Sequence, residues 1–128
     1  MSNAMTEAEQ AIRDARITNR DELLKEYRAC MQRGTQYQKH ATEMYLQAEQ
    51  AAADYAQMKK DFRASPANRG VLPATVDYKF GRYDVAQAAV KDNTWYMTRA
   101  MMSSAAASME FNKAAALMQN IVRIEAKL

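Results

Sequence analysis

From Leu23 to Phe62, apolar or small residues recur at alternating intervals of four and three, and none of them is charged. This spacing is a heptad repeat, which places the residues along one side of an α-helix and predicts that this side packs against another helix. The members of this first seam are Leu23, Tyr27, Cys30, Gly34, Tyr37, Ala41, Met44, Ala48, Ala51, Tyr55, Met58 and Phe62.

A second seam with the same spacing follows in the C-terminal half of the chain. Its members are Tyr83, Ala86, Val90, Asn93, Met97, Ala100, Ser104, Ala107, Phe111, Ala114, Met118 and Ile121. Many residues in both seams are small, so two helices could approach each other closely. We interpret Asn93 as a polar residue that fixes the register of the pair, since buried polar side chains at such positions have that effect.

The segment between the two seams, residues 64–81, contains both prolines and two of the three glycines. Proline and glycine stop helices, so we expect a loop here, flanked by long helices over about 20–63 and about 82–127. The apolar residues of this loop suggest that it folds back onto the ends of the helices. The predicted fold is therefore all-α, a long antiparallel helical hairpin.

The N-terminal region supplies a weaker signal. Either Thr18 and Asp21 or Asn19 and Glu22 resemble a capping box, which predicts a separate short helix over about 6–17 before the long helix. One uninterrupted helix is the alternative. Residues 1–4 are typical of the remnant left after an expression tag is removed, and we expect residues 5–128 to form a single domain.

Composition supports the helical prediction and excludes several other classes. The chain has 128 residues, few β-branched residues, only three glycines and one cysteine. An all-β fold, a βαβ nucleotide-binding fold and a disulfide scaffold do not fit this composition. A lone cysteine and the absence of a signal peptide or of a long apolar stretch predict a cytoplasmic protein that does not enter the membrane.

The second helix is apolar on more than one face. Between Asn93 and Met109 the only charged residue is Arg99. Helices that are apolar on several sides are normally surrounded on several sides, so we expect self-association, most simply a dimer that forms a four-helix bundle. The candidate interface residues lie on flanks outside the seams: Trp95, Met101, Met102, Met109, Ala116, Leu24, Met31 and Tyr45.

We find no pattern of residues that predicts catalysis, a metal or another cofactor. His40 is the only histidine and has Glu43 one turn later, in the reverse order of the Glu-x-x-His motif of carboxylate-bridged metal sites. Cys30 lies on the first seam, where a free cysteine usually acts as a small buried hydrophobe. We therefore expect a protein that is not an enzyme.

The charge balance, with 18 basic and 15 acidic residues, gives only a small positive excess. Basic residues do gather around the predicted turn, with Tyr78 and Phe80 among them, and such a group can hold a nucleic acid strand. This makes nucleic-acid binding an alternative function, although basic residues at the end of a helix also stabilise its dipole. The candidate contacts are Lys59, Lys60, Arg63, Arg69, Lys79 and Arg82.

The stretch from Asp92 to Ala100, Asp-Asn-Thr-Trp-Tyr-Met-Thr-Arg-Ala, leads into a helix rich in alanine and methionine. Together with the preceding helix that contains Glu-Leu-Leu-Lys-Glu-Tyr, it resembles small all-helical accessory proteins of actinobacterial bacteriophages. The resemblance implies a protein of the host cytoplasm, made during infection or acting in assembly, and it supplies no catalytic motif. We expect a protein–protein interaction or assembly module with an unidentified partner besides its own copy.

Overall fold

The computed structural model describes residues 5–128, and every regular element in this range is helical. The order is α1 (Glu7–Arg63), a short 3-10 helix η1 (Pro66–Asn68), α2 (Pro73–Gly81) and α3 (Asp84–Glu125). The all-α prediction is confirmed. Residues 1–4, which we interpret as a tag remnant, lie outside the described residues.

The chain forms two compact units. The central unit is Lys39–Ser104, and the terminal unit combines the described residues up to Gln38 with Ala105–Leu128. Both long helices contribute to both units. The single domain expected for residues 5–128 stays a prediction.

Helix α1 has no break where the sequence suggested one. The expected short helix over 6–17 is continuous with the long helix, as the alternative interpretation had it. The helix starts at Glu7, directly after Thr6, whose Oγ1 accepts a hydrogen bond from the Glu9 N–H at 3.2 Å. A cap at Thr18 would require a residue to leave the helical conformation and would sacrifice backbone hydrogen bonds, and no proline or glycine nearby forces that.

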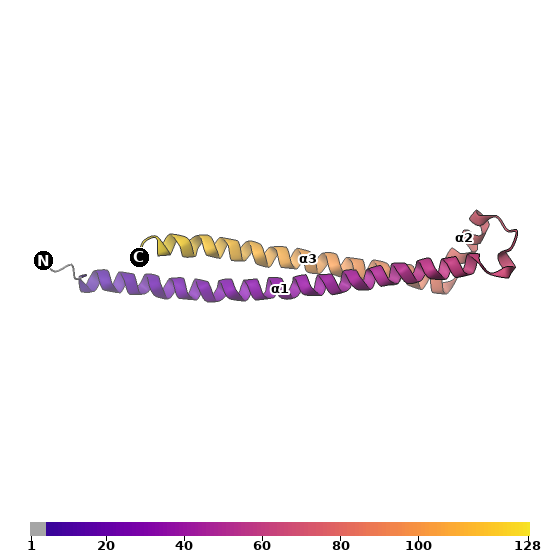
Figure 1. Cartoon of the computed structure of the whole chain (residues 1–128). Coiled ribbons are helices and arrows are strands. Elements are labelled where there is room, and N and C mark those ends of the chain that lie inside the picture. The colour runs from indigo at the N-terminus through magenta and orange to yellow at the C-terminus, as the bar shows by residue number, and fades with distance from the viewer. Residues whose placement is uncertain (1–4) are drawn as a thin grey trace. The chain divides into compact units, whose positions relative to one another are not determined.

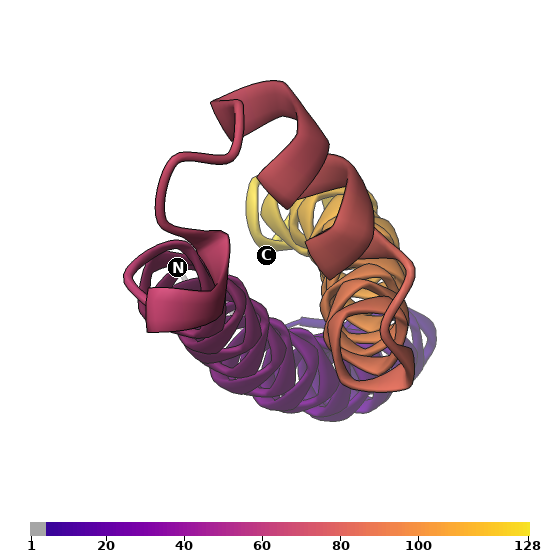
Figure 2. The same ribbon diagram turned by 90° about the vertical axis from the view of Figure 1, so that its right-hand side faces the viewer.

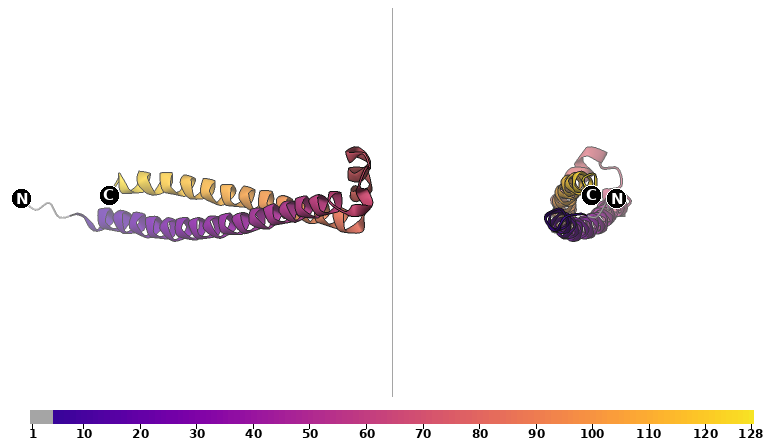
Figure 3. Two further views of the ribbon diagram at one scale, coloured as in Figure 1. Left: turned by 45° about the vertical axis from the view of Figure 1, so that its right-hand side comes forward. Right: turned by 90° about the vertical axis from the view of Figure 1, so that its left-hand side faces the viewer.

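In the terminal unit, the first part of α1 and the last part of α3 run antiparallel along the two predicted seams (Figures 1 and 3). Cys30, Ala107, Ala114 and Ile121 are buried there. At the open end of the pair, the Arg16 guanidinium donates a hydrogen bond to the Lys127 carbonyl oxygen at 3.3 Å.

Gly34 marks a close approach within the terminal unit. A Cβ atom built on this glycine would lie 2.6 Å from Cε1 of Phe111, well inside van der Waals contact. The Phe111 ring therefore occupies space that any other residue at position 34 would fill. This explains why a glycine is present within a helix of 57 residues, where it costs stability.

The central unit is an antiparallel helical hairpin, as the seams predicted. Small residues from both helices are buried between them, including Ala48 from α1 and Ala100 from α3. Asn93 lies on the seam, and its side-chain amide donates a hydrogen bond to the Ala48 carbonyl oxygen at 2.8 Å. A polar side chain that is bonded to one particular carbonyl favours one register over its neighbours, which agrees with our interpretation of Asn93.

The predicted loop over 64–81 is only partly a loop, because α2 occupies its second half (Figure 2). Pro73 stands in the first turn of α2, where a missing backbone N–H costs nothing, so here proline begins a helix instead of ending one. Val76 and Phe80, four residues apart on one face, are both buried. Only Gly70, between η1 and α2, has a positive φ of 79° among the described residues.

Aromatic packing holds α2 against the end of α1. The Phe80 ring, 5% exposed, lies 5.4 Å from the Tyr55 ring and 5.6 Å from the Phe62 ring, measured between centroids. Phe62 also meets Tyr83 edge to face at 5.4 Å. The expectation that apolar residues fold this segment back is thus confirmed for Val76 and Phe80, whereas Leu72 and Tyr78 remain exposed.

Candidate interaction surfaces

The outer face of α3 in the central unit carries a large exposed apolar area. Trp95 is 51% exposed and Met102 is 62% exposed, and the interval of seven residues between them places both on one side of the helix. They line a groove of about 590 Å³, which we call the Trp95 surface, with Val90, Lys91, Thr94, Thr98 and Arg99.

The two hydroxyl groups of the Trp95 surface are satisfied within α3 itself. The Thr94 hydroxyl donates to the Val90 carbonyl oxygen at 3.0 Å, and the Thr98 hydroxyl donates to the Thr94 carbonyl oxygen at 2.8 Å. The Arg99 guanidinium lies over the Trp95 ring at 4.9 Å from its centroid. Hydroxyl groups that already have acceptors lose little when water is removed, so this surface is suited to burial.

The eight predicted interface residues are divided between the two units. Trp95, Met101 and Met102 belong to α3 in the central unit, but Met101 does not line the Trp95 surface, because six residues of helix rotate it away from Trp95. Tyr45 lies on α1 of the same unit and is partly exposed. The other four residues belong to the terminal unit: Met109, Ala116, Leu24 and Met31.

In the terminal unit, the exposed residues of this set are Met109 and Ala116 on α3 and Met31 on α1, whereas Leu24 is half-buried. A separate groove of about 450 Å³ follows α3 there, lined by Ala115, Met118, Gln119, Val122 and Arg123. None of the eight predicted interface residues lines it, so the sequence analysis missed this groove.

The basic residues around α2 are partly engaged inside the central unit. Arg63 donates hydrogen bonds from Nε and Nη2 to the two carboxylate oxygens of Asp77, each at 2.7 Å. These hydrogen bonds lower the pKa of Asp77 and raise that of Arg63. Arg82 lies over the Tyr78 ring at 5.7 Å from its centroid. Arg63 therefore ties the end of α1 to α2, which reduces what this cluster offers to nucleic acid.

The other basic residues predicted to contact nucleic acid are not held by such an ion pair within the described part of the chain. Lys60, Arg69, Lys79 and Arg82 have exposed side chains, and Lys59 is half-buried.

Cys30 is part of a small polar group that the sequence did not reveal. Its side chain is 1% exposed, and its Sγ accepts a hydrogen bond from Arg33 at 3.3 Å. Arg33 also forms an ion pair with Glu110 at 3.1 Å, and its hydrogen bond lowers the pKa of Glu110. These contacts join α1 to α3 in the terminal unit and surround a thiol that has no access to solvent.

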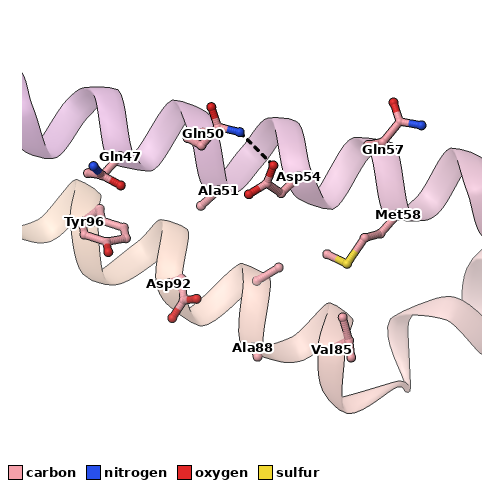
Figure 4. A pocket seen from close by; sticks show the side chains of 11 residues that line it. Gln47, Gln50, Ala51, Asp54, Gln57, Met58, Val85, Ala88, Asp92 and Tyr96 are labelled. Atoms are coloured by element: carbon pink, nitrogen blue, oxygen red, sulfur yellow. Dashed lines mark hydrogen bonds between the residues drawn. The ribbon is translucent and has the colours of Figure 1, made fainter.

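A second groove of the central unit lies between α1 and α3 and encloses about 700 Å³ (Figure 4). Its walls carry Asp54 from α1 and Asp92 from α3, and the Gln50 amide donates to Asp54 Oδ1 at 2.8 Å. We call it the Asp54 groove. The other residues that line it are Gln47, Ala51, Gln57, Met58, Val85, Ala88, Ala89 and Tyr96.

The sequence analysis also missed the Asp54 groove, although the sequence contains a trace of it. Gln50 and Asp54, and likewise Gln57 and Asp61, are paired at i,i+4 by hydrogen bonds along the side of α1 next to the first seam. The heptad spacing shows that these two pairs flank the first seam. Only the pairing with α3 shows that Asp92 and Val85 face them.

Residues 5–128 contain no group of three or more His, Cys, Asp or Glu side chains that could hold a metal ion, and His40 is exposed. No helix within this range is long and apolar enough to cross a membrane.

Comparison of the chain with protein-family models, with curated proteins and with solved structures finds no match. The resemblance of Asp92–Ala100 to bacteriophage accessory proteins therefore stays a prediction, and so does the cytoplasmic location.

Proposed function

We propose that this protein is a non-enzymatic, helical interaction module that self-associates through the Trp95 surface of α3. The observation that carries the proposal is the exposure of Trp95 and Met102 on one side of a helix whose opposite side is already buried against α1. Complete burial of a large apolar side chain contributes roughly 1.5–3 kcal/mol, and covering the part of Trp95 and of Met102 that is still exposed would contribute about half of that for each. A soluble chain gains that energy only if something covers them.

A second copy of the chain is the occupant that fits best. Trp95 and Met102 lie seven residues apart, and a helix with such a stripe can interlock with an identical stripe. A methionine sulfur also packs well against an aromatic ring, so Trp95 of one copy would find a suitable neighbour in Met102 of the other. Two helix pairs joined in this way would give the four-helix bundle that we expected from the sequence.

Trp95 provides a direct test, because it is the only tryptophan in the chain. We expect its fluorescence emission to shift to shorter wavelength as protein concentration rises, in step with an increase in molar mass measured by light scattering. The variant Met102→Glu should remain monomeric with its helicity unchanged, because a buried, unpaired carboxylate is costly. The matched control Ala53→Glu, at an exposed position of α1, should associate like the wild type.

A monomer at all concentrations, with Trp95 emission typical of a solvated indole, would refute self-association through this surface. High salt separates the proposal from the nucleic-acid alternative. Apolar association should persist when salt is raised, whereas binding of a nucleic acid by the basic residues around α2 would weaken steeply.

A further inference from the structure

We propose that the Asp54 groove is a docking site for a basic amphipathic α-helix of a partner protein. The groove and the Trp95 surface share no lining residue, although Ala88 of the groove lies seven residues before Trp95 on α3. The inference therefore goes beyond self-association, and each can fail without the other.

The shape of the groove fits a helix. On α1 its lining residues extend from Gln47 to Met58, a span of roughly 17 Å at the rise of an α-helix, which corresponds to about three turns. A partner helix of three turns can present anchor side chains at i, i+3/i+4 and i+7 to such a groove.

Much of the lining is apolar and small. Ala51, Ala88 and Ala89 leave room for a third helix to approach closely, and Val85 and Met58 add apolar area (Figure 4). Met58 reaches from α1 toward α3 in this view, and its flexible side chain can adapt to a partner. The apolar face of an amphipathic helix would thus find contacts here.

The charge of the groove selects the partner. The carboxylates of Asp54 and Asp92 stand on opposite walls, and no lysine, arginine or histidine is among the lining residues. Neither carboxylate forms an ion pair within residues 5–128. The amides of Gln47 and Gln57 add further hydrogen-bonding groups along the α1 side.

A basic helix satisfies both the apolar lining and the acidic walls. Lysine and arginine have long apolar stems that can cover alanine and valine while their charged ends reach a carboxylate at the rim. A row of such residues on each side of an apolar stripe would meet Asp54 on one wall and Asp92 on the other. Acidic helices would meet like charges on both walls and be rejected, and this kind of repulsion gives an interface its specificity.

The test uses two fluorescein-labelled model peptides of 18 residues, each with leucine along one helical face. One peptide carries lysine on both sides of the leucine stripe, and the other carries glutamate at the same positions. Binding is followed by fluorescence anisotropy with the variant Met102→Glu as well as with the wild type, so that a failure of self-association does not affect the result. We expect the lysine peptide to bind and the glutamate peptide not to bind.

Charge reversal then locates the site. The double variant Asp54→Lys, Asp92→Lys should bind the lysine peptide about tenfold more weakly, and should gain binding of the glutamate peptide. The control Glu49→Lys, at an exposed position of α1 outside the groove, should bind like the wild type. Ala88→Gln, which puts a longer neutral side chain into the groove, should weaken binding while the exposed position tolerates the change.

Four results would overturn the proposal. The wild type could bind neither peptide, or both equally. Glu49→Lys could weaken binding as much as the double variant does, which would indicate attraction by overall charge. Finally, the double variant could lose self-association, which would show that a second copy of this chain occupies the groove.

Discussion

Gly34 lies so close to Phe111 that replacing it with alanine should change the free energy of unfolding in two opposite ways. Replacing Gly34 with alanine in the interior of α1 should gain about 1 kcal/mol from helix propensity. The new methyl group, however, would lie 2.6 Å from Cε1 and 2.9 Å from Cδ1 and Cζ of the Phe111 ring. Overpacking of this kind costs about 1–3 kcal/mol, so we expect Gly34→Ala to destabilise the protein by about 1 kcal/mol.

A second variant, Phe111→Ala, removes the ring that the new methyl group would contact, and so separates the steric cost from the gain in helix propensity. In that background the added methyl meets no ring, so Gly34→Ala should stabilise the protein by about 1 kcal/mol, and the double-mutant cycle should show a coupling of about 2 kcal/mol. Unfolding in urea, followed by circular dichroism at one fixed protein concentration, measures all four proteins under equal conditions.

Gly81→Ala serves as the control for propensity alone. Gly81 is the last residue of α2, and a Cβ atom added there has nothing within 4 Å, so the change should be neutral or slightly stabilising. Our reasoning would be refuted if Gly34→Ala were as stable as the wild type, or if its cost persisted when Phe111 is replaced by alanine.

Three further changes test the central unit. Phe80→Ala should destabilise the unit by about 3–5 kcal/mol, since the ring is buried, and limited proteolysis should then cut near α2 sooner. Asn93→Ala should cost about 1 kcal/mol in urea unfolding, because the bond to the Ala48 carbonyl is lost while that carbonyl keeps its place in α1. Asp77→Asn should lower the melting temperature near neutral pH. Because the pKa of Asp77 is lowered in the folded protein, the ionised carboxylate stabilises the fold at pH values above the ordinary pKa of aspartate, and this stabilisation is lost as the pH falls through the pKa of Asp77 in the folded protein. The melting temperatures of the variant and the wild type should therefore converge in acid. A difference that stays constant with pH would contradict the role of the ion pair with Arg63.

The heptad spacing was informative because it reports which side of each helix is buried. Ala41, Ala48, Ala86 and Ala100 were all placed on the seams by spacing alone, and all are buried. Spacing was less informative about exposure on the flanks. Leu24 has the same character as Met102 in the sequence, yet the structure half-buries it.

The segment around α2 shows where local signals fail. Pro73 was interpreted as a helix breaker, because proline ends helices far more visibly than it begins them. The burial of Phe80 against Tyr55 and Phe62 involves residues 18 or more positions apart, and no local pattern contains such a contact.

The sequence by itself determined that this protein is helical, which sides of its long helices pack together, and that α3 has apolar residues beyond that packing. These properties follow from helical periodicity, which is a property of each helix alone. The tertiary structure decided which residues from different helices meet: Arg33 with Glu110, Arg63 with Asp77, and the carboxylates of Asp54 and Asp92 on facing walls of one groove. Such contacts depend on the register between two helices, and a heptad repeat leaves the register open because a shift of seven residues preserves the same pattern.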